Sequence, residues 1–219
     1  MEILVKELTV LVNIFCFLVP VIPVTLKIAV VSFILALILG LIVALMKVSH
    51  FGIFKLTARV YVDVIRGIPL LVQIFFIYFG LGKILNLEQL PASILAISIC
   101  YSAYLGEIIR AGIEAIPKGQ VDASRSLGMN TYQTMRYIVL PQAFRIVLPP
   151  ISNEFIACLK DTSLVSIIGL RELTRAGREY YSQYFVDFET WFMVGLIYLA
   201  MTVALSKVSH FIETKYKIT

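Results

Sequence analysis

Long apolar stretches dominate the chain, and the shorter segments between them hold most of the charged residues. A membrane-spanning helix needs about 20 mostly apolar residues, because each residue rises ~1.5 Å through a hydrocarbon core of ~30 Å. Five stretches meet this requirement, namely residues 22–46, 61–82, 91–112, 146–169 and 189–211. The pattern predicts an all-α fold, a polytopic membrane helical bundle of about five transmembrane helices, with residues 1–219 forming a single domain.

Prolines, a glycine and one tryptophan indicate where these helices bend or begin. Gly67 and Pro69 predict a bend near the start of the second span. The fourth span is expected to start after the Pro149-Pro150 pair. Trp191 lies near the beginning of the fifth span, where an aromatic ring suits the membrane interface.

The composition agrees with a membrane environment. Hydrophobic residues make up 59% of the 219 residues and charged residues only 15%, with a mean hydropathy of +0.90, whereas a soluble domain carries about 25% charged residues. The net charge of +5 is modest, and the basic residues form no stripe of the kind that binds nucleic acid. His50 and His210 stand alone, so no metal site is expected.

The first 20 residues are expected to form an external amphipathic segment that leads into the first span. They place Glu2 and Glu7 beside Lys6, and no cleavage site of small residues follows them. A secretory signal peptide begins with a basic region and ends with such a site, so this alternative is disfavoured.

The charged residues between the spans predict an orientation, because Lys and Arg accumulate in loops that stay in the cytoplasm. Three segments are rich in them, and their basic residues are Lys47, Lys55 and Arg59, then Lys118, Arg125, Arg136 and Arg145, then Lys207, Lys215 and Lys217. With five spans, these segments share one side only if the N-terminus is outside and the C-terminus is cytoplasmic. Arg171, Arg175 and Arg178 on the other side weaken this contrast.

Five spans also bear on how a solute pathway is completed. Transporters built from inverted repeats need two matched sets of helices within one chain, and an odd number of spans cannot be divided in that way. A complete pathway is therefore expected to need a second copy or a partner.

The segment 117–141 is too apolar for a plain loop and too charged for a span. It predicts two short helices: the first follows Pro117 and ends at Gly128, and the second ends at Pro141. Asn130 with Gln133 three residues later resembles a capping box that starts the second helix. Such a hairpin suits docking in a groove of another protein or lying on a lipid surface, and composition alone leaves both open.

The spacing within this segment resembles the EAA loop of prokaryotic ABC importer permeases, which reads Glu-Ala-Ala, three residues, Gly, nine residues and Ile-x-Leu-Pro. The matching residues are Asp122, Ala123, Ser124, Gly128, Ile138, Leu140 and Pro141. Asp122 replaces Glu and Ser124 replaces Ala, and both changes preserve charge or size. The stretches 61–73, 102–120 and 153–169 resemble the polar amino acid uptake subfamily of these type I importers, and the similarity covers nearly the whole chain from Thr25 onward.

The resemblance implies a subunit of a homo- or heterodimer in a prokaryotic cell membrane. It implies that the EAA segment docks on two ABC ATPase subunits, which bind ATP and Mg, and that an extracytoplasmic solute-binding protein delivers a polar or basic amino acid. The chain has no phosphate-binding G-x-x-x-x-G-K-[ST] loop of its own. The chain is therefore expected to be no enzyme and to hold no cofactor.

Charged and polar residues within the spans are candidates for contact with the solute, since an ionisable group at membrane depth faces a partner or a polar cavity. Glu154 and Asp161 lie at i and i+7 on one stripe of the fourth span, with Cys158 between them. The third span carries Ser98, Ser102 and Tyr104. Pairing within the protein, such as Glu154 with Arg145 or Arg110, is the alternative to substrate binding.

A third group, Glu107, Arg110 and Glu114, has the i, i+3 and i+7 spacing of salt bridges that steady a helix, so a structural role is expected. Two rival functions remain open at this stage. One is an oligomeric channel or secondary carrier subunit for a small polar solute. The other is a membrane adaptor that recruits an enzyme without transport. Neither rival needs the EAA spacing.

Overall fold

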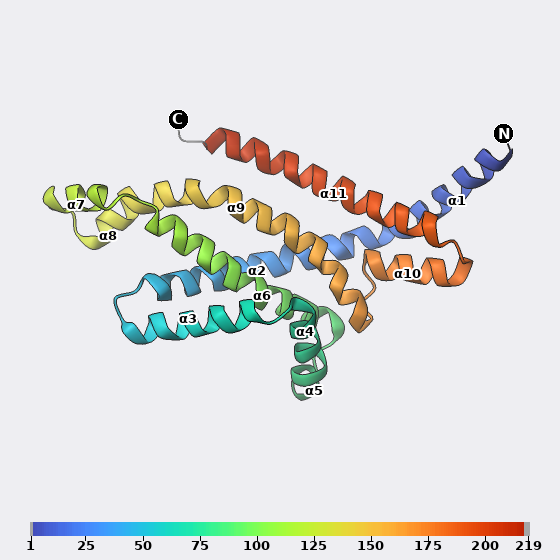
Figure 1. Ribbon diagram of the computed structural model, residues 1–219, viewed down its shortest axis with the longest axis horizontal. Coiled ribbons are helices and arrows are strands. Elements are labelled where there is room, and N and C mark those ends of the chain that lie inside the picture. Colours follow the sequence, from blue (N-terminus) through green and yellow to red (C-terminus); the bar gives the residue numbers. More distant parts are fainter. Residues whose placement is uncertain (1, 217–219) are drawn as a thin grey trace. The chain divides into compact units, whose positions relative to one another are not determined.

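The computed structural model describes residues 2–216, and these residues are helical almost throughout, with no strand among them (Figure 1). The α-helices are α1 Glu2–Leu18, α2 Ile22–Val48, α3 Gly52–Gly67, α4 Leu70–Phe75, α5 Gly82–Leu85, α6 Gln89–Glu114, α7 Lys118–Ser126, α8 Thr131–Thr134, α9 Leu140–Asp161, α10 Leu173–Tyr184 and α11 Asp187–Tyr216. Short 3-10 helices cover Val19–Val21 and Thr162–Ile168, and π-helical segments cover Phe76–Leu81 and Met135–Val139.

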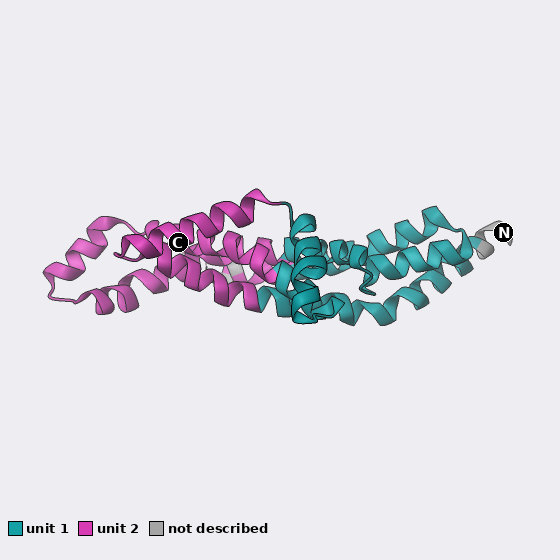
Figure 2. Ribbon diagram, turned by 90° about the horizontal axis from the view of Figure 1, so that it is seen from below, with its two compact units in different colours: residues 1–34, 69–97, 156–205 teal, residues 35–68, 98–155, 206–219 magenta. Residues whose placement is uncertain are grey.

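The chain forms two compact units (Figure 2). Unit 1 comprises residues 1–34, 69–97 and 156–205, and unit 2 comprises residues 35–68, 98–155 and 206–219. Four of the five boundaries between them fall inside α2, α6, α9 and α11, so four continuous helices contribute residues to both units, and the fifth falls between α3 and α4.

In unit 1, α1 packs against α10 and α11 around a buried apolar cluster. Its members are Ile14, Leu18, Val21, Leu173, Ala176, Tyr180, Val194 and Ile197. The ring of Phe17 meets that of Tyr180 edge-on at 5.1 Å between centroids. From Glu2 onward, the expected amphipathic segment at residues 1–20 is thus helical. It packs on the protein through Ile14 and Leu18, and it continues through the 3-10 turn into α2.

Glu172 is a fully buried carboxyl in unit 1 that caps the N-terminus of α10. It accepts hydrogen bonds from the backbone N–H groups of Thr174 (3.0 Å) and Arg175 (2.8 Å) and from the Tyr198 hydroxyl (3.0 Å). Burial raises the pKa of Glu172 above its usual range, although these hydrogen bonds act in the opposite direction.

In unit 2, close backbone contacts hold α2, α3, α6 and α9 together. Val43, Ala58, Val62 and Ala103 form a buried cluster of α2, α3 and α6. Where α2 meets α6, a Cβ atom built on Gly40 would lie 2.9 Å from the Cβ of Leu105. Gly40 acts as small residues do in membrane helix pairs, because it allows two backbones to approach closely.

The all-helical membrane bundle is confirmed, but the count of spans differs from the prediction. Three helical stretches are long and apolar enough to cross a membrane, namely Glu7–Val48, Gln89–Glu114 and Asp187–Ile212. The pair Gly52–Gly67 and Leu70–Leu85 adds a fourth if it is one broken span, and the break falls at the predicted Pro69. The predicted span at residues 146–169 is not among them, because α9 carries Arg145, Glu154, Lys160 and Asp161.

The prediction that the fourth span starts after Pro149-Pro150 is wrong, because both prolines lie inside α9. In a regular helix the N–H groups of residues 149 and 150 would bond the carbonyls of Arg145 and Ile146, and the two prolines have no such N–H. The helix nevertheless continues past both of them. The helix α10 was also not expected, since its 12 residues are too short and too polar for a span.

Candidate coupling hairpin and solute pathway

The hairpin at residues 117–141 begins with α7, which ends at Gly128 in the left-handed conformation, with φ +81°. The Gly128 N–H donates to the Arg125 carbonyl at 2.9 Å, and the Met129 N–H donates to the Ser124 carbonyl at 3.1 Å. This pair of bonds is the Schellman motif, which satisfies the last carbonyls of a helix. The predicted helix end at Gly128 is confirmed.

The capping box at the start of α8 is also confirmed. The Asn130 side chain accepts from the Gln133 N–H and the Gln133 side chain accepts from the Asn130 N–H, each at 2.9 Å. The direction of the chain through the turn is therefore fixed by hydrogen bonds on both sides of Gly128.

Polar contacts then hold the two arms of the hairpin against each other. The hydroxyls of Ser124 and Thr134 lie 2.8 Å apart and both residues are buried. Ser124 donates to the Val121 carbonyl at 2.7 Å, so its single proton is used and Thr134 is the donor between the two hydroxyls. A second contact joins the Gln142 amide to the side-chain oxygen of Gln120 at 2.6 Å.

The prediction that the second helix of the hairpin ends at Pro141 is wrong. α8 continues through the π-helical segment Met135–Val139 into α9 without a break. The Leu140 N–H donates to the Met135 carbonyl, and Pro141 follows in the first turn of α9. A proline inside a continuous helix has no N–H to offer the preceding turn, and the π-helical segment directly before Pro141 is where the regular bonding of this helix is interrupted. The hairpin and the helix α9 are thus one continuous element.

The outer side of the hairpin carries the remaining residues of the EAA-like pattern. Asp122, Ala123, Gly128, Leu140 and Pro141 are exposed, and Ile138 is half-buried. Leu127, which the sequence pattern did not single out, is 84% exposed, and the exposed Tyr132 and Tyr137 follow it on the other arm. Exposed apolar side chains such as Leu127 and Tyr132 on an otherwise polar hairpin suit a surface that binds another protein.

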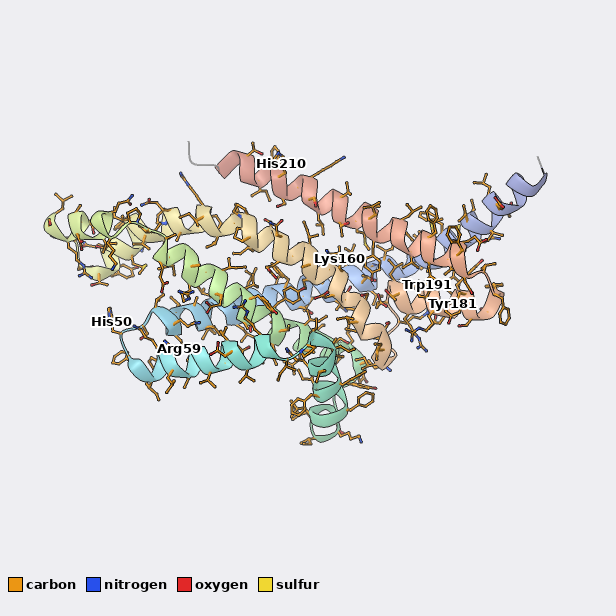
Figure 3. All side chains as sticks on the ribbon, in the orientation of Figure 1. His50, Arg59, Lys160, Tyr181, Trp191 and His210 are labelled. Carbon is orange, nitrogen blue, oxygen red and sulfur yellow. The ribbon has the colours of Figure 1, made fainter. Side chains whose placement is uncertain are left out.

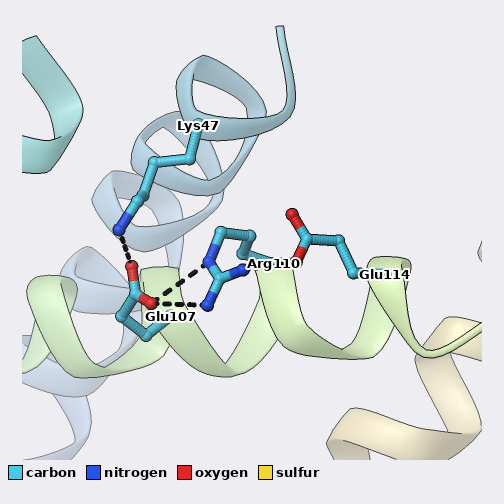
Figure 4. Close-up of polar contacts among 4 residues, drawn as sticks. All are labelled: Lys47, Glu107, Arg110 and Glu114. Atoms are coloured by element: carbon cyan, nitrogen blue, oxygen red, sulfur yellow. Dashed lines mark hydrogen bonds and ion pairs between the residues drawn. The ribbon is translucent and has the colours of Figure 1, made fainter. Parts of the chain in front are cut away.

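The structural role expected for Glu107, Arg110 and Glu114 is confirmed, and Lys47 joins them (Figure 4). Glu107 accepts from the Arg110 guanidinium at 2.9 and 3.1 Å, and Arg110 also pairs with Glu114. The Lys47 ammonium at the end of α2 pairs with the other oxygen of Glu107. The network therefore joins two helices of unit 2 instead of steadying α6 alone.

The polar residues proposed from the third span lie on α6 in unit 2, where Ser98 and Ser102 are buried. The Ser102 hydroxyl donates to the Ile99 carbonyl at 2.7 Å and lies 2.6 Å from the hydroxyl of Tyr61 on α3, a residue that the sequence did not single out. Tyr104 is half-buried, and the Arg66 guanidinium lies over its ring at 5.0 Å. Two contacts therefore link α3 to α6, one between Tyr61 and Ser102 and one between Arg66 and Tyr104.

Glu154 and Asp161 are half-buried on α9, seven residues apart as the sequence predicts. Asp161 is the last residue of α9, directly before the 3-10 helix Thr162–Ile168. Lys160 beside it is exposed (Figure 3), while Cys158 is buried with its Sγ 3.9 Å from the Ala29 carbonyl.

Two cavities lie elsewhere in the units. A cavity of about 390 Å³ in unit 2 is lined only by apolar side chains of α2, α6 and α9, among them Leu41, Ile109 and Phe144, and this lining does not suit a polar solute. A cleft of about 380 Å³ in unit 1 is lined by Tyr78, Glu88, Gln89, Leu90 and Leu170. Neither contains the residues expected to contact the solute.

Comparison with known proteins identifies the type of chain. The family model for the binding-protein-dependent transport system inner membrane component matches residues 36–218. The chain belongs to this family. The chain also has relatives among proteins of known function. It is 39% identical over 196 residues to the arginine transport system permease protein ArtQ of Bacillus subtilis (strain 168), with 89% of this chain and 90% of that protein covered.

A second relative is the glutamine transport system permease protein GlnP of Escherichia coli (strain K12). It is 38% identical over 197 residues, with 89% of this chain and 90% of that protein covered. A crystal structure of an amino acid ABC transporter with histidines matches with a TM-score of 0.88 and 40% identity, covering 93% of this chain and 96% of that one. An inward-facing MetNI methionine ABC transporter shares the fold, with a TM-score of 0.81, 18% identity, and 94% of this chain and 99% of that one covered.

The chain is therefore a multi-pass transport subunit with the fold of type I ABC importer permeases. Its relatives are permease subunits, in agreement with the expectation of a transport subunit rather than an enzyme. The rival interpretation as a channel or secondary carrier is not favoured by any of these relatives.

Proposed function

We propose that this chain is the transmembrane subunit of an ATP-driven importer of polar or basic amino acids. The EAA-spaced hairpin carries this proposal, because its arms are locked by the Ser124–Thr134 contact and its exposed residues form a surface for another protein. The substrate class is supported by relatives named for the transport of arginine, glutamine and L-cystine.

The proposed assembly pairs this subunit with a second, identical or homologous permease subunit to complete the pathway. Two ABC ATPase subunits bind the ATP and Mg, and an extracytoplasmic binding protein delivers the amino acid. Residues 1–219 act as one permease domain, which agrees with the four helices that contribute to both compact units.

Coupling in this proposal runs from the hairpin into α9. An ATPase that moves the exposed surface around Asp122 and Leu127 moves the hairpin as a unit, because its arms cannot slide without breaking the buried Ser124–Thr134 contact and the exposed Gln142–Gln120 hydrogen bond. The uninterrupted path from α8 to α9 passes this motion to the helix that carries Glu154 and Asp161.

Within the pathway, we assign the carboxylates of Asp161 and Glu154 to the cationic groups of the amino acid. Ser98, Ser102 and Tyr104 on α6 are the further polar residues that we assign to contact with the amino acid. Ser102 is held by Tyr61 and Tyr104 by Arg66, so their positions are fixed before a solute binds. The orientation that fits this assembly has the N-terminus outside and the C-terminus and hairpin in the cytoplasm, as the basic segments predict.

Coexpression with the cognate ATPase tests the proposal. Leu127→Arg is expected to abolish copurification of the ATPase and ATP-driven uptake in proteoliposomes, because it places a charge on the exposed apolar part of the hairpin. The control Ile84→Arg changes an exposed apolar residue of α5, outside the hairpin, and should retain both activities. Amino acid uptake that needs neither ATP nor the ATPase would instead establish a channel or carrier.

A further inference from the structure

Aromatic side chains gather on the surface where α10 turns into α11. The exposed aromatic residues there are Tyr184, Phe185, Phe188, Trp191 and Phe192, which we call the aromatic corner. Phe185 is 86% exposed and Phe188 is 78% exposed, more than most apolar side chains of the described residues. All five belong to unit 1. Contiguous exposed apolar surface of this kind marks an interaction site.

The backbone of Phe185 gives a second, independent indication. Phe185 closes α10 in the left-handed region, with φ +54° and ψ 39°, and its N–H donates to the Tyr181 carbonyl at 2.8 Å. Glycine usually occupies this position, because a side chain with a Cβ atom is disfavoured there. The Phe185 backbone is strained and its ring is exposed, so packing within this chain does not offset the strain. We therefore look for a stabilising contact of the ring outside the chain.

The rings of the corner support one another. Phe188 and Phe192 stack with 6.0 Å between centroids, and the ring of Trp191 lies 5.8 Å from that of Tyr181 (Figure 3). These pairs hold the corner in shape along the first turns of α11. The acidic Asp187 and Glu189 stand among them, so the surface does not attract anionic groups.

The position of the corner on a membrane-spanning helix identifies what covers it. The span Asp187–Ile212 has 26 residues, and at ~1.5 Å per residue it exceeds the ~30 Å of a hydrocarbon core. Its first turns therefore reach the boundary between headgroups and acyl chains, where Trp and other aromatic rings are enriched.

We propose that the aromatic corner is an interfacial anchor that inserts Phe185 and Phe188 between the headgroups and acyl chains of zwitterionic lipids. The anchor fixes the depth at which α11 enters the bilayer and keeps α10 at the membrane surface. This role needs only that α11 spans the membrane, so it stands independently of the substrate and of the ATPase.

Single-tryptophan reporters test the anchor, since Trp191 is the one tryptophan of the chain. In a Trp191→Phe background, Phe185→Trp and Phe188→Trp are placed in phosphatidylcholine vesicles whose acyl chains carry bromine at known depths. Both reporters should emit at shorter wavelength than in water, and bromine near the headgroup end should quench them more than bromine near the chain end. The matched control Ser182→Trp, on the exposed polar side of α10, should be quenched by aqueous acrylamide instead.

Reporters at 185 and 188 that are as open to acrylamide as the control would overturn the proposal. Protection that arises only after the extracellular binding protein is added would also overturn it, in favour of a protein-docking surface.

A second variant keeps Trp191 in place as the reporter. Phe185→Gly should reduce quenching of Trp191 by bromine and shift its emission toward longer wavelength, because the corner loses an anchoring ring. Asn86→Gly is the matched control, since Asn86 is the other non-glycine residue with positive φ among residues 2–216 and closes α5 in the same way. Equal spectra for the two variants would show that Phe185 anchors nothing.

Discussion

Gly128 determines the direction in which the hairpin turns, since it is the residue between α7 and the capping box that adopts positive φ. A Cβ atom there would meet no neighbour within 4 Å, so space does not exclude a larger side chain. Only the backbone conformation does, at a cost of about 1–2 kcal/mol for a left-handed residue with a Cβ atom. A substitution at Gly128 therefore tests the effect of backbone strain without that of a steric clash.

Gly128→Val is expected to lower ATP-driven uptake strongly while the protein still reaches the membrane, because the strained turn displaces one arm of the hairpin. Gly119→Ala is the matched control within the same hairpin: it is helical, meets nothing within 4 Å, and should stabilise α7 by up to about 1 kcal/mol. Uptake and membrane content are measured together. Normal uptake by Gly128→Val would contradict the role of the turn.

Glu172 gives a prediction about pH. Its raised pKa means that the folded protein holds this proton more tightly than the unfolded chain does. The corresponding stability is complete below the ordinary carboxyl pKa and is lost as the pH rises through the raised value. Glu172→Gln keeps an acceptor for the N–H groups of Thr174 and Arg175 but cannot ionise, so it should flatten the decline of the melting temperature over this range.

Glu172→Leu separates the hydrogen bonds from the charge. It leaves two N–H groups of α10 and the Tyr198 hydroxyl without their acceptor, which should destabilise the protein by about 1–3 kcal/mol per unsatisfied group at every pH. A Leu variant as stable as the Gln variant would show that the cap contributes little.

At the scale of helices, the contact between α2 and α6 depends on glycines. A Cβ atom on Gly40 would lie 3.1 Å from the backbone N of Gly106 and 3.1 Å from the carbonyl of Ser102, and backbone atoms cannot move aside. A Cβ atom on Gly106 would lie 2.8 Å from the Cγ1 atom of Val43, which a rotamer change can move, and its nearest backbone atom would be the Gly40 carbonyl oxygen at 3.3 Å. The two glycines are therefore not equivalent.

Gly40→Ala is expected to lower stability by about 1–3 kcal/mol and Gly106→Ala by less, since overpacking is worst against rigid atoms. Gly195→Ala on α11 is the control, because a Cβ atom there would meet nothing within 4 Å. Thermal unfolding in lipid nanodiscs measures the order of the three. A Gly40 variant as stable as the control would mean that the helices separate at little cost.

Local rules along the chain explain which elements could be predicted from sequence. Gly128 and the Asn130–Gln133 box depend on residues within one turn, so their types and spacing were sufficient. The continuation of the helix past Pro141 was missed because it depends on π-helical bonding, which has no simple sequence signature. The Ser124–Thr134 and Lys47–Glu107 pairs join residues of separate helices, so only the packed chain shows them.

For the whole molecule, the family and the helical fold could be predicted from the sequence. The lengths of the apolar stretches and the EAA spacing are both local features that can be read directly from it. The residues that contact the solute do not follow in the same way. Glu154 and Asp161 share a face of α9 by helix geometry, but in the proposed assembly the pathway also depends on a second subunit. Substrate selection is therefore the property that has to be tested on the assembled transporter.

Asp161→Asn is expected to weaken uptake of basic amino acids roughly tenfold more than uptake of neutral ones, which corresponds to about 1.4 kcal/mol of lost attraction to the second positive charge. Competition by a panel of amino acids in proteoliposomes measures this ratio, and ATP hydrolysis is followed in the same samples. Asp187→Asn, an exposed acid at the start of α11, is the matched control and should leave the ratio unchanged. Equal losses for basic and neutral amino acids, with ATP hydrolysis also reduced, would place Asp161 in the coupling of the helices instead of in the pathway.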